Sequence, residues 1–541
     1  MRCIICLTRL SNSMDARQVI KEGQAVLGIE FGSTRIKAVL VDPDGKPVAQ
    51  GSHEWENRLE GGLWTYSEED IWGGLQDCYA SLRADVQQRY GVEIESLAAA
   101  GVSAMMHGYL AFDKAGALLV PFRTWRNTNT GPAAKALSEL FDFNMPLRWS
   151  LSHLYQCILD GETHVPQVDF FTTLAGFVHW RLTGRKVLGV GDASGMMPID
   201  PATGDFDERR IAAFDKLVAS KAYPWHLRDI LPEVLPAGVP AGVLTEEGAR
   251  LLDPSGHLRA GIPFCPPEGD AGTGMTATNA VRPRTGNVSA GTSSFSMIVL
   301  ERDLKKPNEM IDVVTTPDGA PVAMVHCNNC TSEINAWAGV FREFQELMGG
   351  KADMGAIFDA LFRSALDGDA DCGGLLAYNY LSGEPVTGLT EGRPLFVRSA
   401  ADRFNLANFM RSQLYGAVGV LKIGNDVLFR EEGVGVDRIT GHGGFFKTPV
   451  AGQKVLAAAL GSPISVMETA GEGGPWGMAL LASYMIDGSG ETLPDYLDGH
   501  VFADAKVTVV EPSGEDIEGF NVWLEKYRRG LSVEHKAVET V

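Results

Sequence analysis

The chain has 541 residues, of which 45% are hydrophobic and 21% are charged, and its formal net charge is −21. A single hydrophobic core rarely grows to this size, so we expect at least two domains, and the ordinary balance of apolar and charged residues excludes long disorder. The negative charge excludes general attraction to nucleic acid or to an anionic membrane surface, so any phosphate would be bound locally by backbone amides, basic side chains or metal.

The eight cysteines are scattered along the chain, which is not the spacing of a disulfide framework and favours the reducing cytoplasm. Two C-x-x-C pairs occur, Cys3/Cys6 and Cys327/Cys330, but neither has the second pair or spaced histidine that structural zinc needs. The N-terminal run is too short and too interrupted for a signal peptide or a membrane span. We expect residues 1–23 to form a flexible extension outside the fold, with Met14 as an alternative start.

The stretch from residue 25 reads AVLGIEFGSTRIKAVLVDPDGKPVAQGSHEW. Its apolar runs and turn residues predict a three-stranded meander with turns at residues 32–34 and 42–45. Ser67 precedes three acidic residues and predicts the N-cap of a helix, and LAAAGVSAM at residues 97–105 predicts a buried strand. This order predicts an α/β lobe whose sheet is covered on both faces.

A second hairpin with the same pattern occurs much later. GNVSAGTSSFSMIVL at residues 286–300 repeats the spacing of LGIEFGSTRIKAVL at residues 27–40, which predicts a duplicated lobe that begins near residue 284. Glycine at such a turn lets phosphate approach, while backbone amides and hydroxyls supply donors. Either hairpin alone is more often an ordinary turn, but the pair favours two phosphate cradles, Gly32 to Thr34 and Gly291 to Ser294.

Asp270 lies in the glycine-rich segment PPEGDAGTG, residues 266–274, between the two hairpins. An aspartate in a loop is usually a turn residue or a helix cap. Phosphoryl transfer to an alcohol, however, needs one carboxylate that accepts the hydroxyl proton. Asp270 is flanked by glycines at a predicted strand-to-helix junction and is therefore the candidate base.

GHGGFF at residues 441–446 follows a predicted strand and precedes a helical stretch that ends near Leu460. Its glycines favour either contact with the base or ribose of a nucleotide or a tight strand-to-helix turn, and both interpretations stay open. GEGGPWG at residues 471–477 opens another predicted helix, over residues 478–485, whose small residues permit close helix packing.

In this order, these segments resemble the FGGY carbohydrate kinases of the actin-like ATPase superfamily, from about residue 25 to 530. GIEFGST (28–34) and SAGTSS (289–294) resemble the phosphate hairpins of the family, GDAG (269–272) its catalytic loop, and YLSGE (380–384) a further family segment. The resemblance implies an α/β fold of two duplicated actin-like (ribonuclease H-like) lobes with an ATP and sugar cleft between them. The implied lobes are residues 24–283 and 284–505, followed by a C-terminal helix and tail at 506–541.

The resemblance also implies the roles of individual residues. Asp270 is the catalytic base, and Glu30, where most relatives have aspartate, is the carboxylate that faces Mg²⁺ bound to ATP. The implied sugar-binding residues are Met106, His107, Trp64, Trp125 and Asn127, the last in place of a family carboxylate. The implied ATP-binding residues are Gly32, Ser33, Thr34, Lys37, Gly291, Thr292, Ser293, Gly441, Gly443, Gly444 and Phe445.

The implied function is a cytoplasmic kinase that uses ATP and Mg²⁺ to phosphorylate a hydroxyl of a small sugar, with a ketopentose such as D-xylulose as the first expectation. Gluconate, another sugar acid or a polyol is the alternative substrate, and a nucleotide-binding sensor without catalysis is the alternative from another class. The expected partners are the sugar and ATP, without nucleic acid or membrane. The oligomeric state stays open, and a homodimer is compatible with it.

Overall fold

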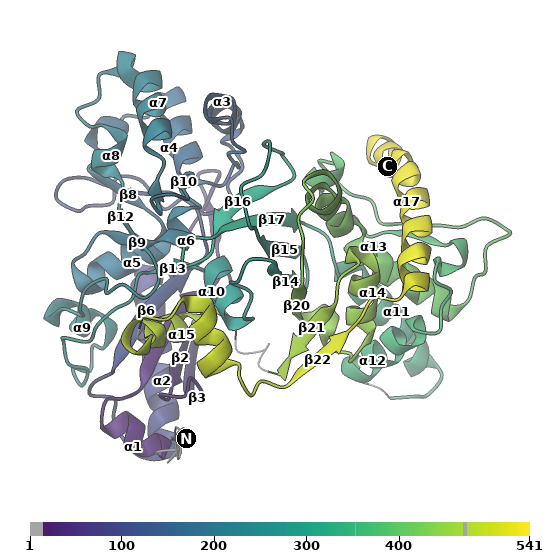
Figure 1. Ribbon diagram of the computed structural model, residues 1–541, viewed down its shortest axis with the longest axis horizontal. Coiled ribbons are helices and arrows are strands. Elements are labelled where there is room, and N and C mark those ends of the chain that lie inside the picture. Colours follow the sequence, from purple (N-terminus) through teal and green to yellow (C-terminus); the bar gives the residue numbers. More distant parts are fainter. Residues whose placement is uncertain (1–14, 352, 469–472, 489) are drawn as a thin grey trace, which may run out of the picture.

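The computed structural model describes residues 15–351, 353–468, 473–488 and 490–541, and Figure 1 shows two lobes side by side, each built around a β-sheet with helices against it. Cys3, Cys6 and Met14 lie outside the described residues. The predicted α/β architecture of two lobes is confirmed.

The N-terminal lobe contains a 5-stranded sheet with the order β13-β6-β1-β2-β3. The predicted meander is confirmed, since β1, β2 and β3 pair antiparallel in sequence order, whereas β6 and β13 run parallel to β1. The five strands are β1 (Val26–Phe31), β2 (Arg35–Val41), β3 (Pro47–Glu54), β6 (Ala99–Ala104) and β13 (Glu268–Gly269).

The C-terminal lobe repeats this topology. Its 7-stranded sheet has the order β16-β17-β15-β14-β20-β21-β22, in which the five strands from β17 to β21 have the order and directions of β3, β2, β1, β6 and β13. The predicted duplication is therefore confirmed, with an extra strand at each edge. The strands are β14 (Thr285–Ala290), β15 (Ser294–Val299), β16 (Asp312–Thr315), β17 (Pro321–Cys327), β20 (Arg438–His442), β21 (Ile464–Met467) and β22 (Val507–Val510).

Helices cover both sheets, as expected for sheets that are apolar on both faces. α2 (Glu68–Tyr90) packs on β3, and its predicted N-cap is confirmed as a capping box between Ser67 and Asp70. In the C-terminal lobe α13 (Leu406–Asp426) is almost entirely buried, and α17 (Gly514–Thr540) closes the chain on α14 (Ala451–Leu460).

The remaining elements connect these layers. In the N-terminal lobe they are β4 (Arg58–Glu60), β5 (Leu63–Thr65), β7 (Leu110–Phe112), α3 (Gly131–Phe141), α4 (Ser150–Leu159), β8 (Phe170–Thr172), α5 (Leu174–Thr183), β9 (Val187–Gly189), α6 (Val190–Ala193), β10 (Ile199–Asp200), β11 (Asp205–Phe206), α7 (Glu208–Val218), α8 (Leu227–Ile230), β12 (Glu233–Leu235), α9 (Glu246–Leu252) and α10 (Asp270–Ala277). In the C-terminal lobe they are α11 (Ser332–Leu347), α12 (Met354–Ala365), β18 (Leu376–Tyr378) and β19 (Leu395–Val397). None of the helices in the described ranges combines the length and apolarity needed to cross a membrane.

The helix over residues 473–487 follows the second sheet in sequence, within the predicted C-terminal lobe, but packs on the first sheet. α15 (Gly473–Asp487) packs on β1, β6 and α10, and Figure 1 shows it against the strands of the N-terminal lobe. The Trp476 indole donates a hydrogen bond to the carbonyl of Gly45 at 2.8 Å. The physical reason is that α15 is apolar on every side and covers the open face of the first sheet, after which the chain returns to the second sheet as β22.

Within residues 1–23, the part that the structure describes does not form the predicted flexible extension. Residues 16–21 form α1 (Ala16–Lys21), capped by the side chain of Asp15, which accepts a hydrogen bond from Arg17 N–H. Val19 and Ile20 are buried among the side chains that pack beneath the first sheet. Burial of this apolar pair fixes the helix to the lobe.

Gly28 on β1 is where α15 approaches the sheet most closely. A Cβ on Gly28 would overlap the carbonyl oxygen of Pro475 and lie 2.6 Å from the backbone nitrogen of Ala479. We expect Gly28→Ala to lower the free energy of unfolding by about 1–3 kcal/mol, because overpacking must displace the helix backbone. Urea unfolding followed by circular dichroism measures the change.

Gly73→Ala is the matched control, since Gly73 is an exposed position in α2 and an added Cβ there meets nothing within 4 Å. This variant is expected to gain up to about 1 kcal/mol from helix propensity. Equal stability of the two variants would contradict the packing assigned to α15.

Candidate active site

Aromatic side chains hold the tip of the first hairpin. The Gly32 N–H donates to the carbonyl of Arg35 at 3.0 Å and closes the turn. Trp55 donates to the Gly32 carbonyl at 2.7 Å, Tyr66 to the Ser33 carbonyl at 2.6 Å, and Trp125 to the Ser33 hydroxyl at 3.2 Å. These bonds fix the turn before any ligand binds. Sequence reasoning missed the anchoring roles of Trp55 and Tyr66.

The second hairpin is joined to the loop before α11. The carbonyl of Gly291 accepts hydrogen bonds from the backbone and the hydroxyl of Thr331, at 2.9 and 2.8 Å. A Cβ on Gly291 would meet nothing within 4 Å, so the tip has open space beside it. Gly443, with φ 99°, packs against the backbone of Ala290 and thereby brings the turn after β20 beside this hairpin.

A pocket of about 450 Å³ lies next to this hairpin, between α11, α12 and the turn at Gly444. Its walls combine apolar side chains with polar and charged ones, among them Asp359 and Lys447, and Thr331 links the pocket to the hairpin at Gly291. A flat aromatic base fits such a lining, while phosphates would lie toward the glycine turn. The lining includes Thr331, Ile334, Met354, Phe358, Phe362 and Gly444.

Two residues predicted to contact a nucleotide instead support the pocket from behind. Phe445 is fully buried, and its ring packs edge-on against Phe362 with 5.9 Å between centroids. Gly441 is also buried, and a Cβ there would lie 2.6 Å from the Phe446 ring. Nucleotide binding by Gly441 and Phe445 stays a prediction, and Gly443 and Gly444 are exposed at the turn.

Asp270 begins α10, directly after β13, so the predicted strand-to-helix junction is confirmed. Its side chain reaches solvent, yet many protein atoms surround it, and this desolvation raises its pKa to about 6. Hydrogen bonds from the backbone of Met106 and Ala271 and the charge of Arg148 act in the opposite direction. The carboxyl group is thus ionised at neutral pH and able to accept a proton.

Glu30 lies on β1 opposite Lys37 on β2. Desolvation and repulsion by Asp270 raise its pKa to about 7, and Lys37 acts against that rise. The structure therefore brings Glu30, Asp270 and Lys37 into one electrostatic group.

Two further acids lie behind Asp270, and sequence reasoning missed both. Asp192 accepts a hydrogen bond from the Thr173 hydroxyl at 2.6 Å, and Glu268 accepts one from Gly191 N–H at 3.2 Å. Both are buried, and burial raises their pKa values, to about 7 for Asp192 and well above the ordinary range for Glu268. Gly191 and Gly269 are the sequence neighbours of these acids, and such glycines are the sequence signal for closely packed acidic side chains.

Met106 and His107 meet the catalytic loop from the end of β6. A Cβ on Gly269 would overlap Met106, and one on Gly195 would lie 2.7 Å from His107 Nδ1. His107 Nδ1 donates to the carbonyl of Gly195 at 3.0 Å, which leaves Nε2 as an acceptor. Burial, with the charge of Arg148, lowers the pKa of His107 well below its usual range, so the ring is neutral.

Residues of the other lobe reach the same region. His326 on β17 lies within the electrostatic influence of Arg148, as His107 does, and burial lowers its pKa to about 4. Its ring stacks on Phe295, with 6.5 Å between centroids. Sequence reasoning missed both Arg148 and His326, because no local pattern marks an arginine before α4 or a histidine on β17 as close to the same site.

Comparison with known proteins agrees with this geometry. The N-terminal domain of the FGGY family of carbohydrate kinases matches residues 25–275, and the C-terminal domain of that family matches residues 286–486. The chain belongs to the FGGY family of carbohydrate kinases.

Relatives within the FGGY family are distant. Xylulose kinase of Escherichia coli (strain K12) is 22% identical over 292 residues, which cover 53% of this chain and 56% of the relative, so the chain spans about half the length of such curated relatives. Two solved structures from Lactobacillus acidophilus, a gluconate kinase and a ligand-bound xylulose kinase, each have a TM-score of 0.76 at 17% identity. They cover 94% and 95% of this chain and 98% and 99% of their own. These structures confirm the two-lobed fold.

Asn127, predicted to bind sugar, is bound to the Trp64 loop. Its carbonyl oxygen accepts from Trp64 N–H at 2.8 Å, and its amide nitrogen donates to the carbonyls of Trp64 and Thr124 at 2.9 and 3.0 Å. The side chain is buried and fixes the Trp64 loop, and its contact with sugar stays a prediction. Trp64, covered by the Arg126 guanidinium at 3.7 Å, and Trp125 line an open hollow with Ser33.

The cysteine pairs add no metal site within the described residues. Cys327 and Cys330 are buried free thiols, and burial raises the pKa of Cys330 to about 12. Cys157, Glu162 and His164 do cluster, but the Arg123 guanidinium donates to the carboxylate of Glu162 and to the sulfur of Cys157. An arginine in this position already supplies the positive charge that a metal ion would bring.

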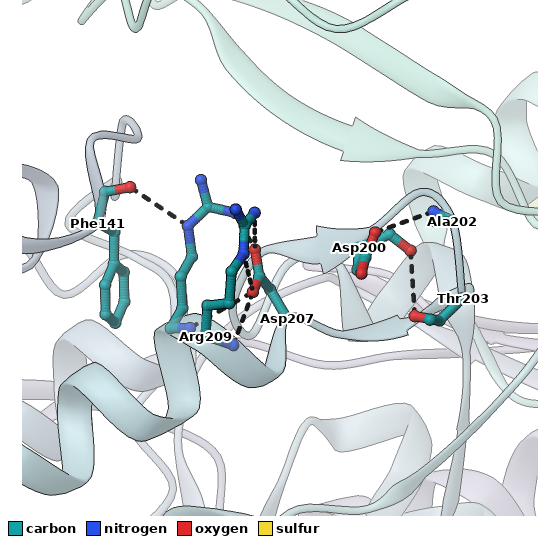
Figure 2. Close-up of polar contacts among 7 residues, drawn as sticks. Phe141, Asp200, Ala202, Thr203, Asp207 and Arg209 are labelled. Carbon is teal, nitrogen blue, oxygen red and sulfur yellow. Dashed lines mark hydrogen bonds and ion pairs between the residues drawn. The ribbon is translucent and has the colours of Figure 1, made fainter.

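A smaller cavity of about 240 Å³ lies where segments of the two lobes meet, away from Asp270. Figure 2 shows the polar contacts on its N-terminal side: Asp207 caps α7 and pairs with Arg209, while Asp200 binds the turn at Ala202. Arg209 and Arg210 both pair with Asp207 on this wall.

Asp192 provides a test of the buried acids. Burial raises its pKa from 3.8 to about 7, so the unfolded chain releases this proton first and the carboxyl group costs stability progressively as the pH rises between these values. We expect Asp192→Asn to gain at least about 1 kcal/mol of unfolding free energy relative to the wild type between pH 5 and pH 8. Urea unfolding at both values measures this.

Asp207→Asn is the control of opposite sign. Burial would raise the pKa of Asp207, but the bonds from Arg209 and Arg210 outweigh it and lower the pKa, so its ionised form stabilises the fold at neutral pH. This variant is expected to lose stability at neutral pH and to approach the wild type as the pH falls through 3.8, the ordinary pKa of aspartate. A shift of the same sign in both variants would contradict the assignment for Asp192.

Proposed function

We propose that this protein is an ATP-dependent kinase that phosphorylates a hydroxyl of a small sugar, with a ketopentose such as D-xylulose as the first candidate. The observation that carries the proposal is Asp270, a solvent-accessible carboxylate with a raised pKa, whose neighbour Gly269 packs against Met106, the residue before the neutral acceptor His107. The FGGY family assignment and the base-sized pocket beside Gly291 support ATP as the phosphoryl donor.

In this proposal Asp270 accepts the proton of the sugar hydroxyl as that oxygen attacks the γ-phosphorus of ATP, and ADP leaves. His107 Nε2 accepts a hydrogen bond from another sugar hydroxyl, and the Met106 side chain packs on sugar carbon. Amide groups at the tips of the Gly32 and Gly291 hairpins stabilise the charge on the phosphate oxygens.

The carboxylates of the site suit Mg²⁺. Glu30 and Asp270 repel each other enough to raise the pKa of Glu30, which a divalent cation would relieve, and both supply the oxygen ligands that Mg²⁺ prefers. Glu30 would hold the ion, directly or through water, and when bound Mg²⁺ neutralises charge on the phosphates of ATP.

Two observations bear on the alternatives. The charge of Arg148 next to His107 and the similarity to a gluconate kinase structure favour a sugar acid as the second candidate substrate. The sensor without catalysis is disfavoured, because Asp270 remains both solvent-accessible and ionised. The buried free thiols support a cytoplasmic location.

Asp270→Asn tests the base directly. The amide cannot accept the hydroxyl proton, so we expect turnover to fall by about 10²-fold to 10⁴-fold while ATP binding, measured by calorimetry, stays unchanged. The assay measures ADP release with a panel of pentuloses, hexuloses, polyols and aldonates. If no sugar raises ADP release by the wild type, the kinase proposal is wrong, and full turnover by the variant would overturn the role of Asp270.

Gly444→Leu tests the nucleotide pocket. Gly444 lines the pocket, and an added Cβ meets nothing within 4 Å. The variant is therefore expected to fold, with the leucine side chain in the space where the base is proposed to bind. The KM for ATP should rise at least about tenfold while the KM for the sugar changes little. Gly73→Leu, on the exposed side of α2, is the control, and equal ATP affinity in both variants would place the base elsewhere.

A further inference from the structure

One ion pair joins the two lobes at the edge of the candidate active site. The Arg148 guanidinium, just before α4, pairs through Nη2 with the Asp312 carboxylate, the first residue of β16. Asn144 donates to the other carboxylate oxygen of Asp312 at 3.0 Å and to the carbonyl of Ile311 at 2.9 Å. Both oxygens of Asp312 are therefore bound by the N-terminal lobe.

The backbone around Arg148 is fixed to the wall that carries His107. The carbonyl of Arg148 accepts a hydrogen bond from Gly108 N–H at 3.2 Å, next to His107. The neighbouring Trp149 ring is fully buried and stacks on the imidazole of His107, with 6.1 Å between centroids and 15° between planes. The position of Arg148 is thus tied to His107 on one side and to the opposite lobe on the other.

The ion pair uses only part of the guanidinium. Arginine carries five N–H donors, and among the described residues no acceptor binds Nε or Nη1 of Arg148. Neither atom belongs to the buried polar atoms without a partner, and the Arg148 side chain is 25% exposed, against 12% for Asp312. The unused donors are therefore open to solvent.

The charge of Arg148 acts on three groups of the site, namely His107 and Asp270 of the N-terminal lobe and His326 of the C-terminal lobe. Two of them, His107 and Asp270, are the groups at which the sugar is proposed to bind. A guanidinium with unused donors there is suited to an oxygen acceptor such as a carbonyl, hydroxyl or carboxylate.

We propose that Arg148 is a sugar-binding residue whose free N–H donors bind an oxygen of the sugar, and that Asp312 positions it from the opposite lobe. This inference rests on the proposed kinase function and adds a specificity-determining residue to it. It also makes sugar affinity depend on the approach of the two lobes, because the residue that aligns Arg148 belongs to the C-terminal sheet.

Kinetics of Arg148→Met, Arg148→Lys, Asp312→Asn and the double variant Arg148→Met/Asp312→Asn test this. We expect Arg148→Met to raise the KM for the best sugar at least about tenfold and to leave the KM for ATP within about twofold. Lysine keeps the positive charge but lacks the planar guanidinium, so Arg148→Lys should retain part of the sugar affinity that Arg148→Met loses. Asp312→Asn should raise the KM for the sugar severalfold, and the double variant should be no worse than Arg148→Met, since both act through one guanidinium.

Arg228→Met is the control, because Arg228 pairs with Asp205 inside the N-terminal lobe, with side chains 37% and 39% exposed. It should change neither KM. An unchanged KM for the sugar in Arg148→Met, or additive effects of the two changes, would overturn the proposal.

Thermal unfolding without sugar separates this inference from the proposed function. If the ion pair joins the lobes, Arg148→Met and Asp312→Asn each lower Tm, and the double variant lowers it no further than the larger single effect. If the wild type phosphorylates no sugar but this pattern holds, the kinase function and the sugar-binding role fail while the link between lobes stands. Additive shifts in Tm would overturn the link itself.

Discussion

The packing of α15 on β1 is the constraint on which the candidate site depends. Gly28 allows the backbone of the helix to touch the strand, and Gly474, in the first turn of the helix, lies so close to the Glu30 carboxylate that any side chain would overlap it. A segment more than 400 residues away in the sequence thus covers the sheet and fixes the place of Glu30. The N-terminal lobe is complete only when the chain returns to it.

Burial determines the pKa values of the acidic side chains near β1 and α15. Glu30, Asp192, Glu268 and Asp270 share a small volume, and desolvation is the largest cause of the raised pKa of each. Asp270 differs from the two acids behind it because it still reaches solvent and receives backbone hydrogen bonds and the charge of Arg148. Asp270 therefore has the lower pKa, about 6, at the surface of a group in which Glu30 and Asp192 have pKa values of about 7.

Much of this arrangement was predictable from local sequence. Turn chemistry identified both hairpins, and the glycines around Asp270 identified its strand-to-helix junction. Residue type alone could not reveal the neighbours of Asn127 and Phe445: the Trp64 loop binds the Asn127 side chain, and Phe445 is buried behind Phe362. Arg148 and His326 gave no local signal.

The sequence by itself determined the α/β class, the duplicated hairpins and the position of Asp270, because these follow from hydrophobic periodicity, glycine turns and spacing within a few residues. Only the tertiary structure decided that α15 packs on the first sheet, which acids are buried together, and that Asp312 of the second sheet holds Arg148 beside His107. The physical reason is that burial, pKa and ion pairing depend on segments brought together from distant parts of the chain.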